Sequence, residues 1–270
     1  MVRMINGELK YRLIKYIVIK ERGCKTPLFL LYCSMKIQEQ IKEFFSDITF
    51  IEDGHRYVLG EKGLWSVSHI IHSFEKKVDW GMMAYYSGRK HGISAEVMSN
   101  IWAKENKIST DAGSRVHLFC ENYVKGNEPT CYQELAATKF FKFLEENGYT
   151  ILFKELVMYH KTYLFGGTAD LILLDPLGRL IIADYKTNKD LFKNYKGQKL
   201  LGIFNDLLDQ PYSKYEIQFS LYQILLEQVG IRVDKRWLVY LDRKGEYEIH
   251  ETDDYTGRLE KYLIGKNYVK

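Results

Sequence analysis

The sequence is poor in proline and cysteine, and it has no long apolar run. Only 4 prolines interrupt 270 residues, which favours long, uninterrupted helices and strands. The longest apolar run, residues 28–33, is far shorter than the ~20 residues that a membrane-spanning helix requires. No two cysteines have the C-x-x-C spacing of a zinc or iron–sulfur site. These absences argue against a disulfide scaffold, a cysteine-bound metal cluster and a membrane protein. The cysteines are Cys24, Cys33, Cys120 and Cys131.

The composition is that of an ordinary globular chain, with 46% apolar and 27% charged residues. The net charge is only +4, which is a weak preference for polyanions and less than a dedicated nucleic-acid binder carries. The first residues are basic and mixed, without the apolar stretch of a signal peptide. Scattered thiols in such a chain predict reduced cysteines and a cytoplasmic, intracellular location.

The hydrophobic periodicity predicts helices first, then strands, a further helix and a late hairpin. Ser66 is expected to cap a helix, and Gly113-Ser114 to begin another. The aromatic residues of 79–105 are expected to pack in the core; the alternative is that, with His69 and His72, they form a lid or an arch that a strand threads. The pattern indicates an α/β fold with an N-terminal helical elaboration. The expected helices are 37–45, 66–74, 79–105, 113–123, 138–146, 217–229 and 253–264. The expected strands are two within 48–58, then 151–159, 168–174, 180–186, 236–241 and 247–250.

One predicted hairpin carries most of the information about function. In its turn, Asp175-Pro176-Leu177-Gly178, Asp and Pro favour a type I turn, and the glycine can adopt the left-handed conformation that follows it. This combination predicts a three-residue loop with a bulge at the glycine. Residue 175 then pairs with residue 179, and extending the ladder places Asp170 directly opposite Asp184.

That register creates a conflict of charge inside the sheet. The neighbouring residues, 171–174 and 180–183, are apolar on both faces, which is typical of central strands covered by helices. Asp170, Asp184 and Lys186 point to one side, and two facing carboxylates are costly to bury without a cation between them. Because hard oxygen ligands select Mg²⁺ or Mn²⁺, the hairpin predicts a site for one of these ions.

Asp170 followed by Asp184-Tyr185-Lys186-Thr187 across a hairpin resembles the active site of the PD-(D/E)XK nucleases, and more closely their RecB-like exonuclease branch. The usual Pro-Asp is Ala169-Asp170 here, which keeps the metal ligand. Iron–sulfur members need cysteines near the C-terminal side of the core, and this chain has none after residue 131. The chain therefore resembles only the cluster-free members of this branch. Residues 51–74, a strand pair followed by Ser-Val-Ser-His, are similar to the entry region of phage and mitochondrial genome maintenance exonucleases.

Three more segments resemble this branch over roughly residues 48–250. Residues 113–121 are similar to its upstream helix, residues 154–156 to the acidic strand before the hairpin, and residues 218–222 to its Q-x-x-x-Y helix. The resemblance implies a restriction-endonuclease-like core, a central mixed β-sheet flanked by helices. It divides the chain into an N-terminal extension and a nuclease domain. The expected boundaries are 1–47 for the extension, 48–110 for an opening hairpin and helical lid, 111–252 for the catalytic core and 253–270 for a C-terminal helix, so that the nuclease domain spans 48–270.

The resemblance also implies roles for individual residues. Asp170, Asp184, the Tyr185 backbone carbonyl and His117 would hold the metal, and Lys186 would orient the attacking water and stabilise phosphate charge. The remaining assignments are Glu155 as a further catalytic acid, Glu121 as a partner of His117, and Gln218, Tyr222, Lys189, Lys193 and Lys196 as nucleic-acid contacts. If residues 193–199 are helical, their lysines line one face.

These features predict a Mg²⁺- or Mn²⁺-dependent DNA exonuclease that acts on a free end or a single strand. DNA, and replication, repair or recombination proteins, are the expected partners, with no nucleotide cofactor. A structure-specific or nicking endonuclease with the same site is one alternative. A catalytically inactive DNA-binding accessory protein is another, although the intact Asp170, Asp184 and Lys186 argue against it. Gly166-Gly167 could also be read as a phosphate loop, but no G-K-[ST] follows.

Overall fold

The computed structural model describes residues 27–264 and residue 266. The helices are α2 (Pro27–Phe44), α3 (Val67–His72), α4 (Trp80–His91), α5 (Ala95–Glu121), α6 (Tyr132–Glu146), η1 (Gly202–Phe204), α7 (Pro211–Glu227) and α8 (Thr256–Leu263). The strands are β1 (Ile48–Ile51), β2 (Arg56–Leu59), β3 (Lys62–Ser66), β4 (Thr150–Tyr159), β5 (Phe165–Leu174), β6 (Leu180–Lys186), β7 (Val233–Leu241) and β8 (Tyr247–Glu251). In this part of the chain, no helix combines the length and the apolar character needed to cross a membrane.

The strands form a mixed sheet that is built around β5. The sheet has eight strands in the order β1-β2-β3-β5-β6-β7-β8, and β4 pairs with β5. β5 is antiparallel to β4 and to β6, whereas β6 and β7 run parallel. The predicted α/β fold with a central mixed sheet flanked by helices is confirmed, and it is consistent with the restriction-endonuclease-like core that the resemblance implies.

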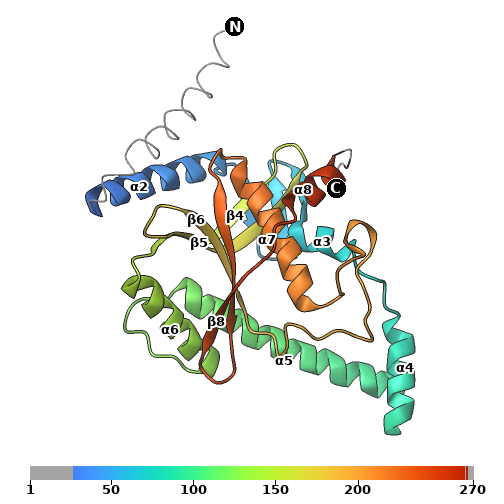
Figure 1. Cartoon of the computed structure of the whole chain (residues 1–270). Helices are drawn as coiled ribbons and strands as arrows, with labels where there is room; N and C mark the ends of the chain where they lie inside the picture. Colours follow the sequence, from blue (N-terminus) through green and yellow to red (C-terminus); the bar gives the residue numbers. More distant parts are fainter. Residues whose placement is uncertain (1–26, 265, 267–270) are drawn as a thin grey trace.

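Each face of the central strands has its own hydrophobic core, because side chains alternate along a strand. Ile172 and Ile182 belong to a cluster that includes residues of α2, α3, α7 and α8. Leu171 and Ala183, one position along, belong to a second cluster with α5 and α6. In Figure 1, α5 and α6 lie on one side of the strands and α3 and α7 on the other. The paired strands of the β5–β6 hairpin are thus enclosed between helical layers, while their turn at Leu177 is exposed.

Capping residues explain where the helices begin, and they correct two predictions. Ser66 caps α3 as predicted. The single helix expected over 79–105 is instead two helices, because Gly92 ends α4 with a φ of +70° and Ser94 caps α5. A helix start at Gly113 is wrong, since α5 continues through this residue. One glycine inside a long helix costs only about 1 kcal/mol, so it does not end α5.

α4 and the first half of α5 form an arm that extends away from the sheet (Figure 1). The prediction that its aromatic residues pack in the core is wrong for Trp80, Tyr85 and Tyr86, which are 68%, 54% and 62% exposed. Trp80 contacts Trp102 of α5 with their rings edge to face. The arm therefore presents aromatic side chains to solvent.

The described part of the N-terminal extension packs on the same core as the sheet. Ile41 of α2 is fully buried, and Gln38 Nε2 donates to the backbone carbonyl of Leu152 at 2.6 Å. Residues 1–26 of the extension, and residues 265 and 267–270 at the other end, lie outside the described residues. The boundary expected at residue 110 falls within α5. The division into an extension and a nuclease domain stays a prediction.

Gly166 and Gly167 lie inside β5, where neighbouring side chains approach the backbone closely. A Cβ at Gly166 would lie 2.9 Å from Tyr57 Cγ, and a Cβ at Gly167 would lie 2.8 Å from Tyr222 Cε1. A phosphate loop would instead precede a helix, so that interpretation does not fit. The two glycines are explained by the need to admit these rings.

We expect Gly167→Ala to destabilise the protein. Its new Cβ would also lie 2.8 Å from Val67 Cγ2, and both Val67 and Tyr222 are buried, at 2% and 4% exposure. Overpacking of this kind costs about 1–3 kcal/mol of unfolding free energy, which chemical denaturation measures. Gly257→Ala is the matched control, because no atom lies within 4 Å of its Cβ position. Equal stability of both variants would contradict the packing account.

Candidate active site

The β5–β6 hairpin has the register that its turn residues predict. Leu171 pairs with Ala183, and Gly178 has a φ of +76° and donates its N–H to the carbonyl of residue 175 at 2.9 Å. Asp170 and Asp184 therefore face each other one position beyond the last paired residues. The prediction that the turn brings these two acids together is confirmed.

Both carboxylates are buried, but their hydrogen bonding differs. Asp170 is 8% exposed, and its Oδ2 accepts the backbone N–H of Tyr185 at 2.8 Å. Asp184 is 2% exposed. Its Oδ2 forms an ion pair with the Lys186 ammonium. Two buried carboxylates close together are costly, and a bound cation would offset their charge.

α5 brings His117 to the same place. Val116 and Cys120 are buried in the cluster beneath α5 and hold the helix against the sheet. His117 Nδ1 lies 3.2 Å from Asp170 Oδ2. Gly113, one turn earlier, lies beside the residue that follows β6, since a Cβ there would make ordinary contact with Thr187 Oγ1 at 3.5 Å. The histidine is thus fixed beside the hairpin by packing on either side of it.

Glu155 reaches the site through an irregular backbone conformation in β4. Lys154 pairs with Leu171 and Leu156 with Ala169, so Glu155 lies level with Asp170. Its φ of +51° is unusual for a residue that is not glycine, and such strain persists only where the surroundings maintain it. One ligand atom each from His117, Glu155 and Asp170 lies within 4.8 Å of the others. The strand therefore adds a third acid to the site.

Lys186 is held between an anion and an aromatic ring. Its side chain is 13% exposed, and its ammonium contacts Asp184. On another side it lies 4.4 Å from the ring centroid of Tyr215, a residue of α7. The Tyr215 hydroxyl donates to Asn188 Oδ1 at 2.7 Å. β6 and α7 thus position the ammonium together.

Burial and mutual charge shift the pKa values of the cluster. Burial, and then the charge of Asp170, raise the pKa of Glu155 to about 7 and that of Asp184 to about 6. Burial would lower the pKa of His117, but the adjacent Asp170 carboxylate raises it to about 9. Burial would raise the pKa of Asp170, but His117 and Lys186 hold it below its usual value. The site therefore retains protons that a bound cation would displace.

The donor set fits a divalent metal ion. Carboxylate oxygens from Asp170, Asp184 and Glu155 are the ligands that Mg²⁺ and Mn²⁺ prefer, and the imidazole of His117 favours Mn²⁺ tolerance. One ligand atom each from His117, Glu155 and Asp170 lies within 4.8 Å of the others, a spacing that one ion can span. The structure does not identify the ion.

The structure brings most of the predicted central residues together, but not all of them. His117 and Glu155 lie close to Asp170, and Lys186 pairs with Asp184 on the facing strand of the hairpin. The expected partnership of Glu121 with His117 is not observed, because His117 contacts Asp170 instead. Glu121 is exposed, and its backbone carbonyl accepts from the ammonium of residue 154 at 2.9 Å. The catalytic and metal-binding roles, including that of the Tyr185 carbonyl, stay predictions.

Gln218 and Tyr222 lie on one face of α7, as their spacing predicts. Gln218 Nε2 donates to the Tyr222 hydroxyl at 2.9 Å. Tyr222 is only 4% exposed and packs against Gly167, so its position suits bracing of the hairpin. A contact of Gln218 or Tyr222 with nucleic acid stays a prediction.

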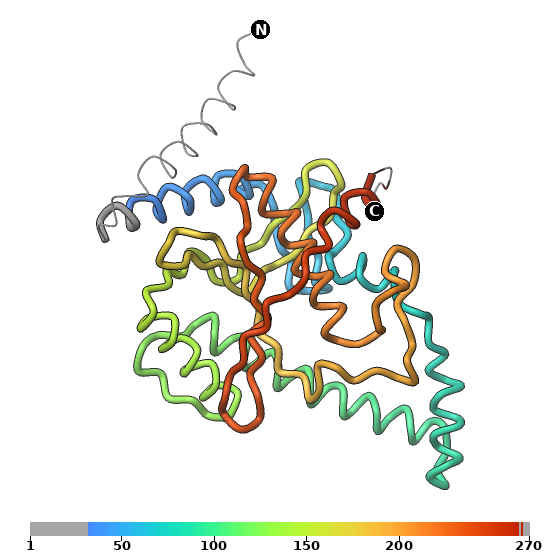
Figure 2. The backbone as a smooth tube through the Cα atoms, viewed as in Figure 1, coloured from blue at the N-terminus to red at the C-terminus, as the bar shows by residue number. Residues whose placement is uncertain are grey.

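The lysine-rich segment after β6 is not the helix that the i+3 spacing of its lysines suggested. Residues 187–201 form turns and irregular structure, and Lys189, Lys193 and Lys196 are exposed. Figure 2 shows the segment leaving β6, reaching toward α3 and returning to α7. The backbone N–H of Leu201 donates to the carbonyl of Phe74 at 2.7 Å, which ties the segment to the end of α3. This tertiary contact overrides the local periodicity.

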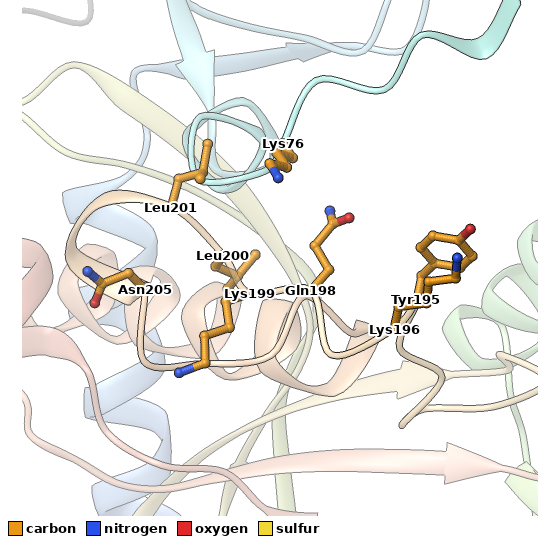
Figure 3. A pocket seen from close by; sticks show the side chains of 8 residues that line it. All are labelled: Lys76, Tyr195, Lys196, Gln198, Lys199, Leu200, Leu201 and Asn205. Atoms are coloured by element: carbon orange, nitrogen blue, oxygen red, sulfur yellow. The ribbon is translucent and has the colours of Figure 1, made fainter. Parts of the chain in front are cut away.

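A cavity of about 430 Å³ lies where this segment meets the residues after α3. Three lysines line it and no acidic residue does. In Figure 3, the ends of Lys76, Lys196 and Lys199 are spread along the cavity instead of meeting at one point, and Tyr195 lies beside Lys196. A spread of positive charge suits a chain of phosphates better than one small anion. The complete lining is Lys76, Tyr195, Lys196, Gln198, Lys199, Leu200, Leu201 and Asn205.

Two residues of these sites were missed at the sequence level. Tyr215 lies three residues before Gln218, so helical spacing alone could have placed both on one face of α7. Lys76 follows α3 and meets the segment after β6 only in the folded chain. Nothing in the sequence around Lys76 indicates that contact.

Comparison with known proteins adds little to this geometry. No protein-family model matches the sequence, and no curated protein matches it. Among solved structures, the chain is similar to a crystal structure of a protein designated SSO0001, with 18% identity and a TM-score of 0.33 over 87% of this chain and 85% of that one. It is also similar to a Eubacterium rectale protein named as a presumed exonuclease, with 15% identity and a TM-score of 0.33 over 74% and 77% of the two chains. Similarity at this level supports no inference about activity.

Proposed function

We propose that the protein is a metal-dependent DNA exonuclease of the RecB-like branch of PD-(D/E)XK nucleases. The observation that carries this proposal is the hairpin that places Asp170 opposite Asp184, with Lys186 beside them. His117 and Glu155 have ligand atoms within 4.8 Å of Asp170, and these three residues could hold a metal ion together. The order of these residues in the chain and their convergence in space agree with the resemblance of the sequence.

Hydrolysis of a phosphodiester forms a bond from water oxygen to phosphorus and breaks the bond to one ester oxygen. A bound Mg²⁺ or Mn²⁺ would supply Lewis acidity and help to stabilise charge on the leaving oxygen. Lys186 would orient the water and offset charge on the phosphate, and burial makes its electrostatic contribution larger than it would be in bulk water. Asp170 and Asp184 would hold the metal beside this ammonium.

The lysine-rich segment supports a nucleic-acid substrate. Lys189, Lys193 and Lys196 are exposed, and the adjoining cavity carries the further lysines Lys76 and Lys199. Positive charge along this path would neutralise phosphates, and the exposed ring of Tyr195 could stack on a base of a single strand.

We expect Lys193→Ala combined with Lys196→Ala to weaken DNA binding about tenfold without changing the catalytic cluster. Loss of two phosphate contacts should flatten the slope of log K against log salt for a single strand by about 1.4. Fluorescence anisotropy with EDTA present measures both quantities. Lys125→Ala with Lys142→Ala is the control, because these exposed lysines pair with Glu145 and Glu146. An unchanged salt slope in the test variant would exclude this binding path.

The substrate experiment compares three DNA substrates during titration with Mg²⁺ or Mn²⁺. Two are linear and end-labelled, one single-stranded and one duplex, and the third is a single-stranded circle. An exonuclease degrades linear DNA and leaves the circle intact. Cutting of the circle would favour the endonuclease alternative. Binding without cleavage at every metal concentration would favour the inactive accessory protein.

A further inference from the structure

We propose that Tyr215 is a positioning residue for Lys186, with its aromatic face holding the ammonium in the orientation that the reaction uses. This inference rests on the proposed function. The resemblance assigns Gln218 and Tyr222 on the same helix but gives no role to Tyr215.

The geometry is that of a cation resting on an aromatic ring. Lys186 Nζ lies 4.4 Å from the centroid of the Tyr215 ring, within the ~6 Å range of cation–π attraction. The side chain of Lys186 is only 13% exposed, so little water competes for its ammonium. The Asp184 carboxylate is its other close partner. Anion and ring together restrict a side chain that is otherwise flexible.

Tyr215 is itself bonded to a side chain just beyond Lys186. Its hydroxyl donates to Asn188 Oδ1 at 2.7 Å. The backbone carbonyl of Asn188 accepts the hydroxyl of Tyr240, on the neighbouring strand β7, at 3.0 Å. The ring is therefore connected, through Asn188, to the segment that directly follows β6.

A neutral aromatic surface has an advantage beside a metal site. When Asp184 ligates a cation, its negative charge is shared and its hold on the Lys186 ammonium weakens. A second carboxylate in place of Tyr215 would compete for that cation. The ring attracts the ammonium through its quadrupole and has no charge of its own. Tyr215 would therefore keep Lys186 in place when the metal is bound.

A series of fluorinated phenylalanines at position 215 tests this role. Phenylalanine and its mono-, di- and trifluoro forms have nearly the same shape, but each fluorine weakens the negative face of the ring. We expect phenylalanine to keep kcat within about threefold of the wild type, and kcat to fall stepwise to about tenfold lower at trifluoro-phenylalanine. KM and the affinity for Mn²⁺ should stay unchanged across the series.

The same series at Tyr212 is the matched control. Tyr212 lies on the same helix, and its ring contacts Phe192 and His250 instead of Lys186. We expect kcat to be the same for every member of the series at position 212. Two results would overturn the proposal: a kcat that does not change with fluorination at position 215, or a kcat that is already lost with phenylalanine there. Either result would show that the face of the ring does not position Lys186.

A second readout does not depend on activity. The methylene protons next to the Lys186 ammonium should show an upfield ring-current shift in the NMR spectrum, which Tyr215→Leu removes. Absence of this shift in the wild type would refute the contact itself. A shifted resonance in a protein that cleaves no DNA would refute the proposed function and the positioning role, while leaving the contact established.

Discussion

Asp184→Asn is expected to lower the rate of DNA cleavage by about three orders of magnitude while the protein stays folded and binds DNA. The amide preserves the volume of the side chain but removes the charge that would hold a metal ion. It leaves Lys186 without its anion. It also removes a charge whose burial, together with repulsion by Asp170, raises the pKa of Asp184 to about 6. These opposing effects should limit the change in stability.

The measurement is single-turnover cleavage of end-labelled DNA with Mn²⁺, combined with thermal unfolding. Asp175→Asn is the control, because Asp175 is a buried acid in the turn of the same hairpin. It accepts the N–H of Leu177 and pairs with Arg179, away from the cluster. The control should lose stability but retain cleavage. Normal cleavage by pure Asp184→Asn protein would refute the assignment of the site.

The affinity for Mn²⁺ should fall steeply as the pH is lowered. A carboxylate or imidazole must lose its proton before it can ligate a cation. The pKa of Glu155 in the metal-free protein is raised to about 7, and that of His117 to about 9. Both groups therefore hold protons below pH 7, and Mn²⁺ binding must release them. If both are ligands, affinity should fall about tenfold per pH unit from 9 to 7 and about a hundredfold per unit from 7 to 6, and more steeply still below 6, where Asp184 is protonated as well.

Isothermal titration calorimetry at several pH values measures these slopes and the protons released. Glu155→Gln should remove one proton from the linkage below pH 7, and His117→Gln should remove the slope between 7 and 9. A constant affinity from pH 6 to 9 in the wild type would show that neither group ligates the ion. A slope that persists in His117→Gln would assign the proton to another residue.

Some parts of the site could be predicted from the sequence, and others could not. The register of Asp170 and Asp184 was predictable because four consecutive residues determine the turn, and pairing then follows along the ladder. Glu155 was predictable as an acid on β4, but its left-handed backbone was not, because nothing local favours that conformation. The bond between His117 and Asp170 depends on how α5 crosses the sheet, which is a matter of tertiary packing.

Two helix predictions from the local sequence were wrong because a stronger helix cap or a tertiary contact determines the structure there. Gly113 predicts a helix start, but Ser94 supplies the cap and α5 continues through the glycine. The lysines of residues 193–199 have helical spacing, yet the bond from Leu201 to Phe74 holds their segment in an irregular path. Such contacts join residues that are distant in the chain, so no local pattern reports them.

The proposed function requires a divalent ion bound between the two facing acids of the hairpin. The most direct test is anomalous diffraction from a crystal soaked in Mn²⁺. The predicted result is one strong Mn²⁺ peak within about 2.0–2.3 Å of oxygens of Asp170 and Asp184, with His117 or Glu155 in the same coordination shell. Mn²⁺ bound elsewhere, with Asp184 still paired only to Lys186, would contradict it.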